Sequence, residues 1–541
     1  MRPVFDGFGL EVRGGERVAV LGPSEAGKST LALCLNGLIP RMIKGDYRGQ
    51  LEVAGLPLQY CRPRHLAGQV GILFQDFEAQ LFCTRVDQEV AFGPENLGLP
   101  LEVLKRRVAG ALSQVGLSGW GRRDPATLSG GQKQLLALAA VLALEPRLLV
   151  LDEPTTDLDP LRVEELLFTL DRLSQKENLT LMLLGEDLRL AWYCSRIVLL
   201  DGGKVAVDGP PGQVLRQVEN FRRLGLRPLG LPALFHDLGQ TELPLNLTEA
   251  ENLAKRLGWK VRHRDSDAGD PAATRTFGPE ILALREVTFS YPGEPAVLQD
   301  LSLSFREGEI TAILGPNGSG KTTLVKLLRG LLQPQAGQVW AAPGTRVGFV
   351  FQNPDYQLFA EQVWEEVAFG PRSLGLDHRE VQARVETALS RVHLLARAEE
   401  DPFSLTKGQR QRLAVAAVLA LSPQVIILDE PTTGLDHREQ QDLLDLVREL
   451  HAQGHTIIMV THSMWAAATY AQRLVVLDDG QIVLDGPTRE VLGQAGVLAE
   501  CSLRPPAVVQ LSRRLGFMAL TPEEFRANIR ERGEGPGEIR D

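Results

Sequence analysis

Residues 310–332 read ITAILGPNGSGKTTLVKLLRGLL. An apolar strand leads into a glycine-rich turn that opens a helix, which is the context that a GxxxxGK[ST] loop requires. Glycines let successive backbone N–H groups converge on phosphate oxygens, and the helix N-terminus adds positive potential. Lys321 can reach the outer phosphates, and Thr322 can ligate Mg2+. We therefore predict a phosphate-binding loop that consists of Gly315, Pro316, Asn317, Gly318, Ser319, Gly320, Lys321, Thr322 and Thr323.

A second loop of this kind follows the strand VAVL in the first half of the chain. It consists of Gly22, Pro23, Ser24, Glu25, Ala26, Gly27, Lys28, Ser29 and Thr30. One match alone would leave a chance glycine-rich turn between a strand and a helix as an open alternative. Two matches at equivalent places make that alternative remote, so we expect both halves to bind nucleotide.

The chain contains an internal repeat, which is the first feature to look for in a long sequence. The motif GILFQDFEAQLF at residue 71 returns as GFVFQNPDYQLF at residue 348. Gln75 and Gln352 are 277 positions apart, and so are Asp152 and Asp429. The segments 226–239 and 503–516 repeat at the same offset, so we expect each half to be a core with a short C-terminal tail.

A length of 541 residues exceeds a single hydrophobic core, since domains usually hold about 100 to 200 residues. Each half runs from a strand through a glycine loop and a long helical stretch to a buried strand. That order indicates an α/β domain with a largely parallel sheet. We predict nucleotide-binding domains at residues 1–225 and 279–502. A first tail with a linker would occupy residues 226–278, and a final tail residues 503–541.

Composition argues against several classes of protein. The formal net charge of −10 disfavours a nucleic-acid footprint. The N-terminal residues carry charges and glycines in place of a secretory apolar core, and the longest apolar run, residues 135–144, is shorter than the roughly 20 residues that span a bilayer. Five scattered cysteines lack the spacing of a zinc or redox motif, which indicates reduced cytosolic residues. We expect any membrane role to come from a partner.

Two apolar strands end in an acidic pair, Asp152-Glu153 and Asp429-Glu430. Such a pair supplies an aspartate for the Mg2+ shell and a glutamate that polarises an attacking water, both of which a phosphate loop lacks. A strand-end acidic pair before proline can also be only a helix cap. The position after VIIL and before PTTGLD favours the catalytic interpretation.

The stretch LSGGQ at residues 128–132 completes the pattern and resembles the signature motif of ABC (ATP-binding cassette) ATPases. The resemblance covers residues 1–225 and 282–500. It implies two P-loop NTPase domains in tandem, each with a helical subdomain and a short tail, that bind ATP and Mg2+ and pair with each other within the chain. The catalytic residues that it implies are Glu430, His462, Gln352 and Glu153.

The same resemblance assigns further contacts. It implies Q-loop glutamines at Gln75 and Gln352, D-loops at Asp159 and Asp436, and an adenine-stacking aromatic at Tyr291. The Mg2+ ligands that it implies are Ser29, Gln75 and Asp152 in the first half and Thr322, Gln352 and Asp429 in the second. In this family ATP lies between the phosphate loop of one half and the signature motif of the other. The second-half loop should therefore meet Ser129, Gly130, Gly131 and Gln132.

The two composite sites differ in their match to this pattern. The second-half site, built on residues 315–323, fits the family pattern throughout. The first-half site, built on residues 22–30, departs from it inside the loop, which reads Ser24-Glu25-Ala26. It would also meet a signature segment in which a lysine replaces a glycine, Leu405-Thr406-Lys407-Gly408-Gln409. Its switch histidine is absent, because that place falls on Gly185 or Glu186. The counterpart of Tyr291 would precede Met1, so either translation begins upstream or the first strand is truncated.

All these departures fall in one composite site. We expect the second-half site to hydrolyse ATP and the first-half site to bind it weakly or hold it as a clamp. Intact Glu153 is the main objection to this hypothesis, and tolerated variation is the alternative.

The segments after Gln75 and Gln352 face the membrane partner in this family. The sequence FQNPxxQLF followed by EVAFG resembles that of the ATPases of energy-coupling-factor importers. That implies a peripheral position on the cytoplasmic side of the cell membrane, a transmembrane scaffold subunit and a separate membrane substrate-binding subunit, with no nucleic acid. We expect Glu78, Glu89, Asp355 and Glu366 to meet basic residues of the scaffold, solvated glutamates being the alternative. Phe82, Phe92, Phe359 and Phe369 are expected in the core or in a groove.

Two other classes remain to be weighed. A tandem ABC protein that acts on ribosomes or DNA is disfavoured because residues 240–278 are short, mixed in charge and rich in glycine, proline and aspartate. A purely regulatory nucleotide binder is disfavoured by the intact second-half motifs. The sequence does not encode the transported compound, and a vitamin, a metal ion or a related small molecule all fit. The two tails are expected to pack against each other, with LTEAENLAKRLG as an amphipathic helix.

Overall fold

The computed structural model describes residues 3–58, 61, 63–156, 158, 160–177, 179–262, 277–293 and 295–530. The chain divides into two compact units, Met1–Leu229 and Gly230–Asp541. The first tail, from residue 230 onward, therefore belongs to the second unit.

A six-stranded sheet forms the centre of the first unit, in the order β4-β5-β6-β1-β7-β8. All neighbours are parallel except β7 and β8, which are antiparallel. Central strands such as LLVLD are buried along their whole length, because helices cover both faces of a parallel sheet. The strands are β1 (Arg17–Leu21), β4 (Val70–Leu73), β5 (Leu148–Asp152), β6 (Thr180–Gly185), β7 (Arg196–Asp201) and β8 (Lys204–Gly209).

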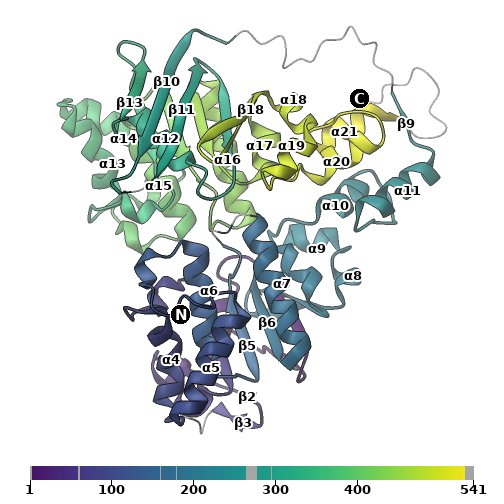
Figure 1. The fold of residues 1–541 in the computed structure, drawn as a ribbon. Coiled ribbons are helices and arrows are strands. Elements are labelled where there is room, and N and C mark those ends of the chain that lie inside the picture. The colour runs from purple at the N-terminus through teal and green to yellow at the C-terminus, as the bar shows by residue number, and fades with distance from the viewer. Residues whose placement is uncertain are drawn as a thin grey trace. The chain divides into compact units, whose positions relative to one another are not determined.

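Three helices of the first unit pack on one another as a helical subdomain, and Figure 1 shows them together. They are α4 (Val86–Asn96), α5 (Leu101–Gln114) and α6 (Gly130–Leu142). The other helices are α1 (Lys28–Leu35), α2 (Leu38–Arg41), α3 (Pro63–Leu66), α7 (Pro160–Glu177), α8 (Pro211–Val214) and α9 (Val218–Arg223). Short 3-10 turns lie at Glu78–Gln80, Pro125–Thr127 and Leu188–Tyr193.

The second unit repeats this plan, with a sheet in the order β14-β15-β16-β12-β17-β18. Its strands are β12 (Ile310–Leu314), β14 (Val347–Val350), β15 (Val425–Asp429), β16 (Thr456–Val460), β17 (Arg473–Asp478) and β18 (Gln481–Pro487). The matching helical subdomain consists of α13 (Val363–Ser373), α14 (His378–Arg391) and α15 (Lys407–Leu419). The fold class predicted from the sequence, two tandem α/β domains with parallel sheets, is confirmed.

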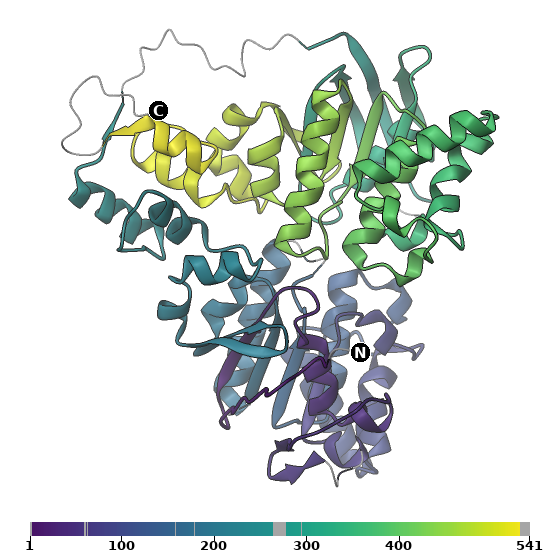
Figure 2. The ribbon, with the colours of Figure 1, turned by 180° about the vertical axis from the view of Figure 1, so that it is seen from behind.

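The remaining elements of this core flank the sheet. The helices are α12 (Lys321–Arg329), α16 (His437–Ala452), α17 (Met464–Tyr470), α18 (Thr488–Gly493) and α19 (Ala495–Glu500), with 3-10 turns at Pro354–Tyr356, Leu395–Arg397 and Pro402–Ser404. Figure 2 shows the same unit from behind.

An antiparallel sheet distinguishes the second unit. It has the order β11-β10-β13, formed by β10 (Glu280–Ser290), β11 (Ala296–Arg306) and β13 (Ala336–Ala341). The described part of the first unit has at this level only the short hairpin of β2 (Glu52–Val53) and β3 (Leu56–Pro57), and its N-terminal segment packs without strand pairing, through Phe5, Phe8, Leu10 and Val12.

That N-terminal segment follows the course of β11. A Cβ on Gly203 would lie 1.7 Å from the carbonyl oxygen of Val4, and a Cβ on Gly480 would lie 2.3 Å from that of Val297. The described N-terminal segment of the first half therefore takes the position that β11 has in the second half, without pairing as a strand.

The two tails pack against each other within the second unit, as the sequence predicted, and Figures 1 and 2 show them side by side. Their elements are α10 (Gly230–Asp237), α11 (Leu247–Leu257), β9 (Lys260–Val261), α20 (Ala507–Arg514), α21 (Pro522–Asn528) and β19 (Ile529–Arg530). Trp259 stacks on Phe235 at 5.0 Å and meets Phe525 edge-on at 6.0 Å. β9 pairs with β19, so both tails share a core and a strand ladder.

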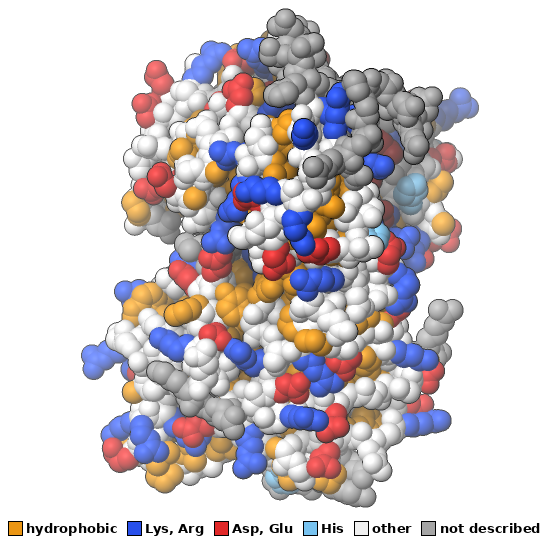
Figure 3. All heavy atoms as spheres, turned by 90° about the vertical axis from the view of Figure 1, so that its right-hand side faces the viewer, with side chains coloured by type: hydrophobic (Ala, Val, Ile, Leu, Met, Phe, Trp, Pro, Cys, Tyr) orange, Lys and Arg blue, Asp and Glu red, His pale blue; other side chains and the backbone are white. Residues whose placement is uncertain are grey.

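None of the helices in the described ranges is long and apolar enough to cross a membrane. On the face in Figure 3, basic and acidic side chains are interspersed.

Candidate active site

The second-half phosphate loop is shaped by residues in the left-handed region. Gly315, Gly318 and Gly320 have φ of 153°, 84° and 99°, and Gly320 caps α12. A Cβ on Gly315 would lie 2.0 Å from the carbonyl oxygen of Leu477, so only glycine fits. The Lys321 side chain is buried, and its Nζ donates to the carbonyl oxygens of Gly315 at 2.9 Å and Pro316 at 2.8 Å. An ammonium thus lies over the loop at the N-terminus of a helix, where anions bind.

The acidic strand end of β15 lies beside this loop. Thr322 Oγ1 donates to Asp429 Oδ1 at 3.2 Å. Burial raises the pKa of Asp429 to about 6, although the hydrogen bond from Thr322 acts in the opposite direction. A hydroxyl and a carboxylate oxygen at this separation suit the hard oxygen coordination of Mg2+. Thr322 and Asp429 could therefore hold the ion.

The side chain of Glu430 contacts His462, and its backbone lies in the left-handed region. His462 Nδ1 lies 2.8 Å from Glu430 Oε2, and the backbone N–H of His462 donates to the same oxygen at 3.3 Å. Burial by itself would raise the pKa of Glu430, but His462 and Lys321 outweigh it, so the pKa is lowered. The residue has φ of 46°, a cost that active sites commonly carry. An ionised, buried carboxylate here can polarise water.

Two predicted residues lie at the edge of this cluster. Tyr291 OH is 3.2 Å from Thr323 Oγ1, and the ring meets Phe289 edge-on. Gln352 is exposed after β14, and among the described residues no hydrogen bond joins its side chain to Asp429 or Thr322. The structure thus brings together Lys321, Thr322, Asp429, Glu430 and His462 but not Gln352.

The first-half loop keeps the shape of the second-half loop despite its different sequence. Gly27 has φ of 98°, and Glu25 adopts φ of 64° where the second half has Gly318. Lys28 Nζ donates to the carbonyl oxygens of Gly22 at 2.6 Å and Pro23 at 3.0 Å. The lysine is therefore placed as in the second half.

Its acidic surroundings differ. Lys28 Nζ lies 3.3 Å from Glu153 Oε1 and 3.3 Å from Glu186 Oε1. Ser24 Oγ lies 3.4 Å from Glu186 Oε1. One ammonium thus faces two carboxylates.

Strand register identifies Glu186 as the counterpart of His462, which alignment left open between Gly185 and Glu186. Asp152 is paired with Leu184 in β6, and Asp429 is paired with Val460 in β16. Glu186 lies two residues after Leu184, and His462 lies two residues after Val460.

The two halves differ in the pKa shift of the glutamate but not in that of the aspartate. Burial raises the pKa of Glu153, and Lys28 offsets this only in part. Burial likewise raises the pKa of Asp152, opposed by a hydrogen bond from Ser29 and by Lys28. Without a histidine partner, Glu153 has the opposite shift to Glu430.

Both signature segments begin helices through a capping box. Ser129 and Gln132 cap α6, and Thr406 and Gln409 cap α15. In the second half the Lys407 side chain folds back, so that a Cβ on Gly434 would lie 2.1 Å from its Nζ. Asp436 caps α16. The predicted D-loop residue Asp159 lies outside the described residues.

The prediction that Glu89 and Glu366 meet a partner is wrong. Both side chains are buried. Glu366 Oε2 accepts from the backbone N–H groups of Phe359 and Ala360, each at 2.8 Å, and Glu89 Oε2 does the same in the first half for Phe82 and Cys83. These glutamates hold the loop after the Q-loop glutamine in place. The signal that sequence reasoning missed is their position on the apolar face of a helix, seven residues beyond the phenylalanine.

The other two acidic residues of that prediction already have partners in the chain. Glu78 pairs with Lys133 at 3.0 Å, and Asp355 pairs with Arg410 at 2.8 Å. Both pairs are partly exposed, so a partner could still contact them.

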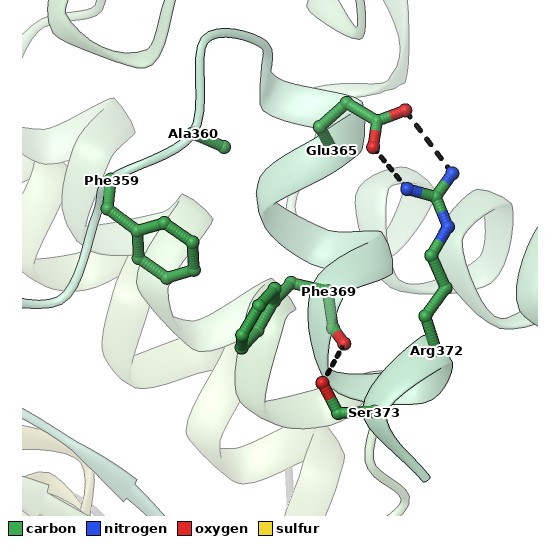
Figure 4. A pocket seen from close by; sticks show the side chains of 6 residues that line it. All are labelled: Phe359, Ala360, Glu365, Phe369, Arg372 and Ser373. Atoms are coloured by element: carbon green, nitrogen blue, oxygen red, sulfur yellow. Dashed lines mark hydrogen bonds and ion pairs between the residues drawn. The ribbon is translucent and has the colours of Figure 1, made fainter. Parts of the chain in front are cut away.

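The four phenylalanines that were predicted to lie in the core or in a groove are exposed on these loops and helices. The core location is therefore wrong, and a groove is found at Phe359 and Phe369. Phe82 and Phe92 meet edge-on at 4.6 Å, and Phe359 and Phe369 do so at 4.8 Å. In the second half, Phe359 and Phe369 line a groove of about 430 Å3 together with Ala360, Ser373 and the ion pair of Glu365 with Arg372, drawn in Figure 4.

Comparisons with known proteins agree with this geometry. The family model for the ABC transporter matches residues 5–156 and 298–433. A protein of Caldanaerobacter subterraneus described as an ABC transporter ATP-binding protein is 43% identical, over 97% of this chain and 95% of the relative. A protein of Bacillus subtilis, YkoD, described as an HMP/thiamine import ATP-binding protein, is 32% identical over 94% of this chain and 93% of the relative.

Among solved structures, cbiO1 of Clostridium perfringens, described as part of the transporter complex cbiONQ, has 33% sequence identity. The match covers 43% of this chain and 99% of that chain, with a TM-score of 0.38.

Proposed function

The chain belongs to the ABC transporter family and carries two ATP-binding domains of that family, which are ATPases, and from this premise we propose that it drives an importer of the energy-coupling-factor type. The observation that carries the proposal is the pair of exposed phenylalanines in each half, beside the segment that resembles the energy-coupling-factor ATPases. Exposed aromatic grooves are anchor sites for protein partners.

The partner we propose is a transmembrane scaffold whose cytoplasmic helices fill the groove at Phe359 and Phe369 and contact the exposed pair Phe82 and Phe92. A separate membrane subunit would bind the substrate. The chain then lies peripherally on the cytoplasmic side of the membrane. The full-length similarity to the Bacillus subtilis relative supports a vitamin-related substrate, with thiamine and its hydroxymethylpyrimidine (HMP) precursor first to test.

We assign ATP hydrolysis to the second-half site. Lys321 and the loop amides bind the outer phosphates, and Glu430, kept ionised by His462, accepts the proton of the attacking water. Thr322 and Asp429 would hold Mg2+, which neutralises phosphate charge in such reactions. In this proposal Ser129 to Gln132 of the first half complete the site when the halves close head to tail, within nucleotide-binding domains at 1–225 and 279–502.

Closure of the halves on ATP would transmit movement to the scaffold through the segments after Gln75 and Gln352. A ligand shifts such an equilibrium only through its differential affinity for the two states. Hydrolysis at the second-half site then removes the contacts that favour closure.

Purification of the tagged chain from native membranes in mild detergent, followed by mass spectrometry, tests the proposal. We expect a polytopic scaffold and a small membrane subunit to accompany the wild-type chain, and Phe359→Ala with Phe369→Ala to reduce their recovery. The matched first-half pair is Phe82→Ala with Phe92→Ala. Recovery of ribosomal or DNA-repair proteins without a membrane partner would overturn the transport function.

A further inference from the structure

We propose that the first-half site selects a nucleoside diphosphate over a triphosphate, because Glu186 occupies the place at Lys28 that a terminal phosphate would take. The inference rests only on nucleotide binding by the family and is independent of the importer type.

The contacts of Glu186 are those of a phosphate oxygen. Its Oε1 lies 3.3 Å from Lys28 Nζ and 3.4 Å from Ser24 Oγ, so that an anionic oxygen meets an ammonium and a hydroxyl on the phosphate loop. The lysine of such a loop reaches the β and γ phosphates. The Glu186 carboxylate already contacts the Lys28 ammonium. The backbone N–H groups of the loop remain available to bind the phosphates nearer the nucleoside.

Local charge acts against a third phosphate. Glu153 and Glu186 both face Lys28, and their side chains are only 17% and 22% exposed, so solvent screens them weakly. A γ-phosphate would bring further negative charge next to two carboxylates that share one cation. A diphosphate ends one group earlier and avoids most of this repulsion.

The second half provides the internal reference. There His462 stands at the position of Glu186 and its ring contacts Glu430, so a single carboxylate is shared by a histidine and a lysine. The two lysines are placed alike, since Lys28 and Lys321 contact equivalent carbonyl oxygens. The difference between Glu186 in the first half and His462 in the second half is therefore what would give the two loops different nucleotide preferences.

The test uses the full chain with Lys321→Ala, which weakens binding at the second-half loop. Fluorescence titration with N-methylanthraniloyl-ADP and the corresponding ATP derivative measures both affinities in Mg2+. We expect the diphosphate to bind at least about tenfold more tightly, since a tenfold ratio corresponds to one modest charge contact. Glu186→Gln and Glu186→His should each remove or invert this ratio.

Glu102→Gln serves as the matched control. Glu102 is an exposed carboxylate of α5 that pairs with Lys105 and lies outside the phosphate loop, so its removal should leave both affinities and their ratio unchanged. Equal affinity for both nucleotides in the parent chain, no binding of the diphosphate, or a ratio that neither Glu186 variant changes would each overturn the proposal. Two substitutions at Glu186 guard against a folding defect in one of them.

Discussion

The two phosphate loops have the same backbone shape and the same lysine contacts, yet the groups around the lysines differ. In the second half, His462 contacts Glu430 and lowers its pKa, whereas in the first half Glu153 pairs with Lys28 and burial raises its pKa. One residue at the end of a strand therefore sets the direction of the pKa shift of the neighbouring glutamate. Loop sequence has less influence, since Glu25 is accommodated in a left-handed conformation.

The largest difference should appear when each glutamate is replaced in turn. Glu430→Gln removes the proton acceptor that we assign to the water, and general-base catalysis commonly contributes about 10² to 10⁴-fold. We expect the ATPase rate of the assembled complex to fall by about 10³-fold. Glu153→Gln should leave more than about half of the rate, because its site lacks the histidine. Steady-state phosphate release measures both.

Equal losses in the two variants would break the comparison, since they would mean that both sites turn over in an obligatory sequence. Binding of ATP to Glu430→Gln is the control, because the phosphate loop is unchanged.

Transplanting the first-half residue into the second half comes next. In His462→Glu, the new carboxylate should compete for Lys321 and no longer stabilise ionised Glu430. Loss of one preorganised electrostatic contact costs about 10² to 10³-fold in related cases, so we expect a loss of about 10²-fold in ATPase rate. His462→Ala is the reference variant. A milder defect for glutamate than for alanine would show that the carboxylate itself is harmless.

The buried glutamates beneath the phenylalanine loops should behave alike in both halves. Glu366→Ala leaves two backbone N–H groups without their acceptor, which costs about 2 kcal/mol. We expect amide hydrogen exchange at Phe359 and Ala360 to accelerate by about 30-fold, and Glu89→Ala to do the same at Phe82 and Cys83. Protection that persists in one half would show that its loop has other support. Glu366→Gln, which keeps an acceptor, should have a smaller effect.

The smallest expected effect concerns pH and Mg2+ at the second-half site. Asp429 has a pKa of about 6, so protons compete with the cation below that pH, whereas Glu430, with its lowered pKa, stays ionised. Between pH 7.5 and 5.5 the free Mg2+ needed for half-maximal ATPase activity should rise about fourfold, as expected for titration of one such group. The measurement holds the MgATP concentration constant. An unchanged requirement would contradict the assigned role of Asp429.

Much of the architecture follows from the sequence alone. The two phosphate loops, the buried strands that end in acidic pairs and the repeat with its offset of 277 predicted two tandem α/β domains, because each rests on local spacing or strand periodicity. Among the described residues, the three-stranded antiparallel sheet lies in the second unit, and Tyr291 directly follows its strand β10. The amphipathic tail helix is also a local pattern, and α11 forms where it was predicted.

Tertiary structure decided the contacts between residues that are distant in sequence. Strand register selected Glu186 over Gly185, and the fold turned Glu89 and Glu366 inward to bind backbone N–H groups. The placement of residues 230–262 with the second unit likewise depends on an aromatic core shared with the final tail. A single sequence gives the order of charged and apolar residues. The sheet brings the strand ends together, and only this decides which carboxylate a lysine contacts and whether that contact is buried or in water.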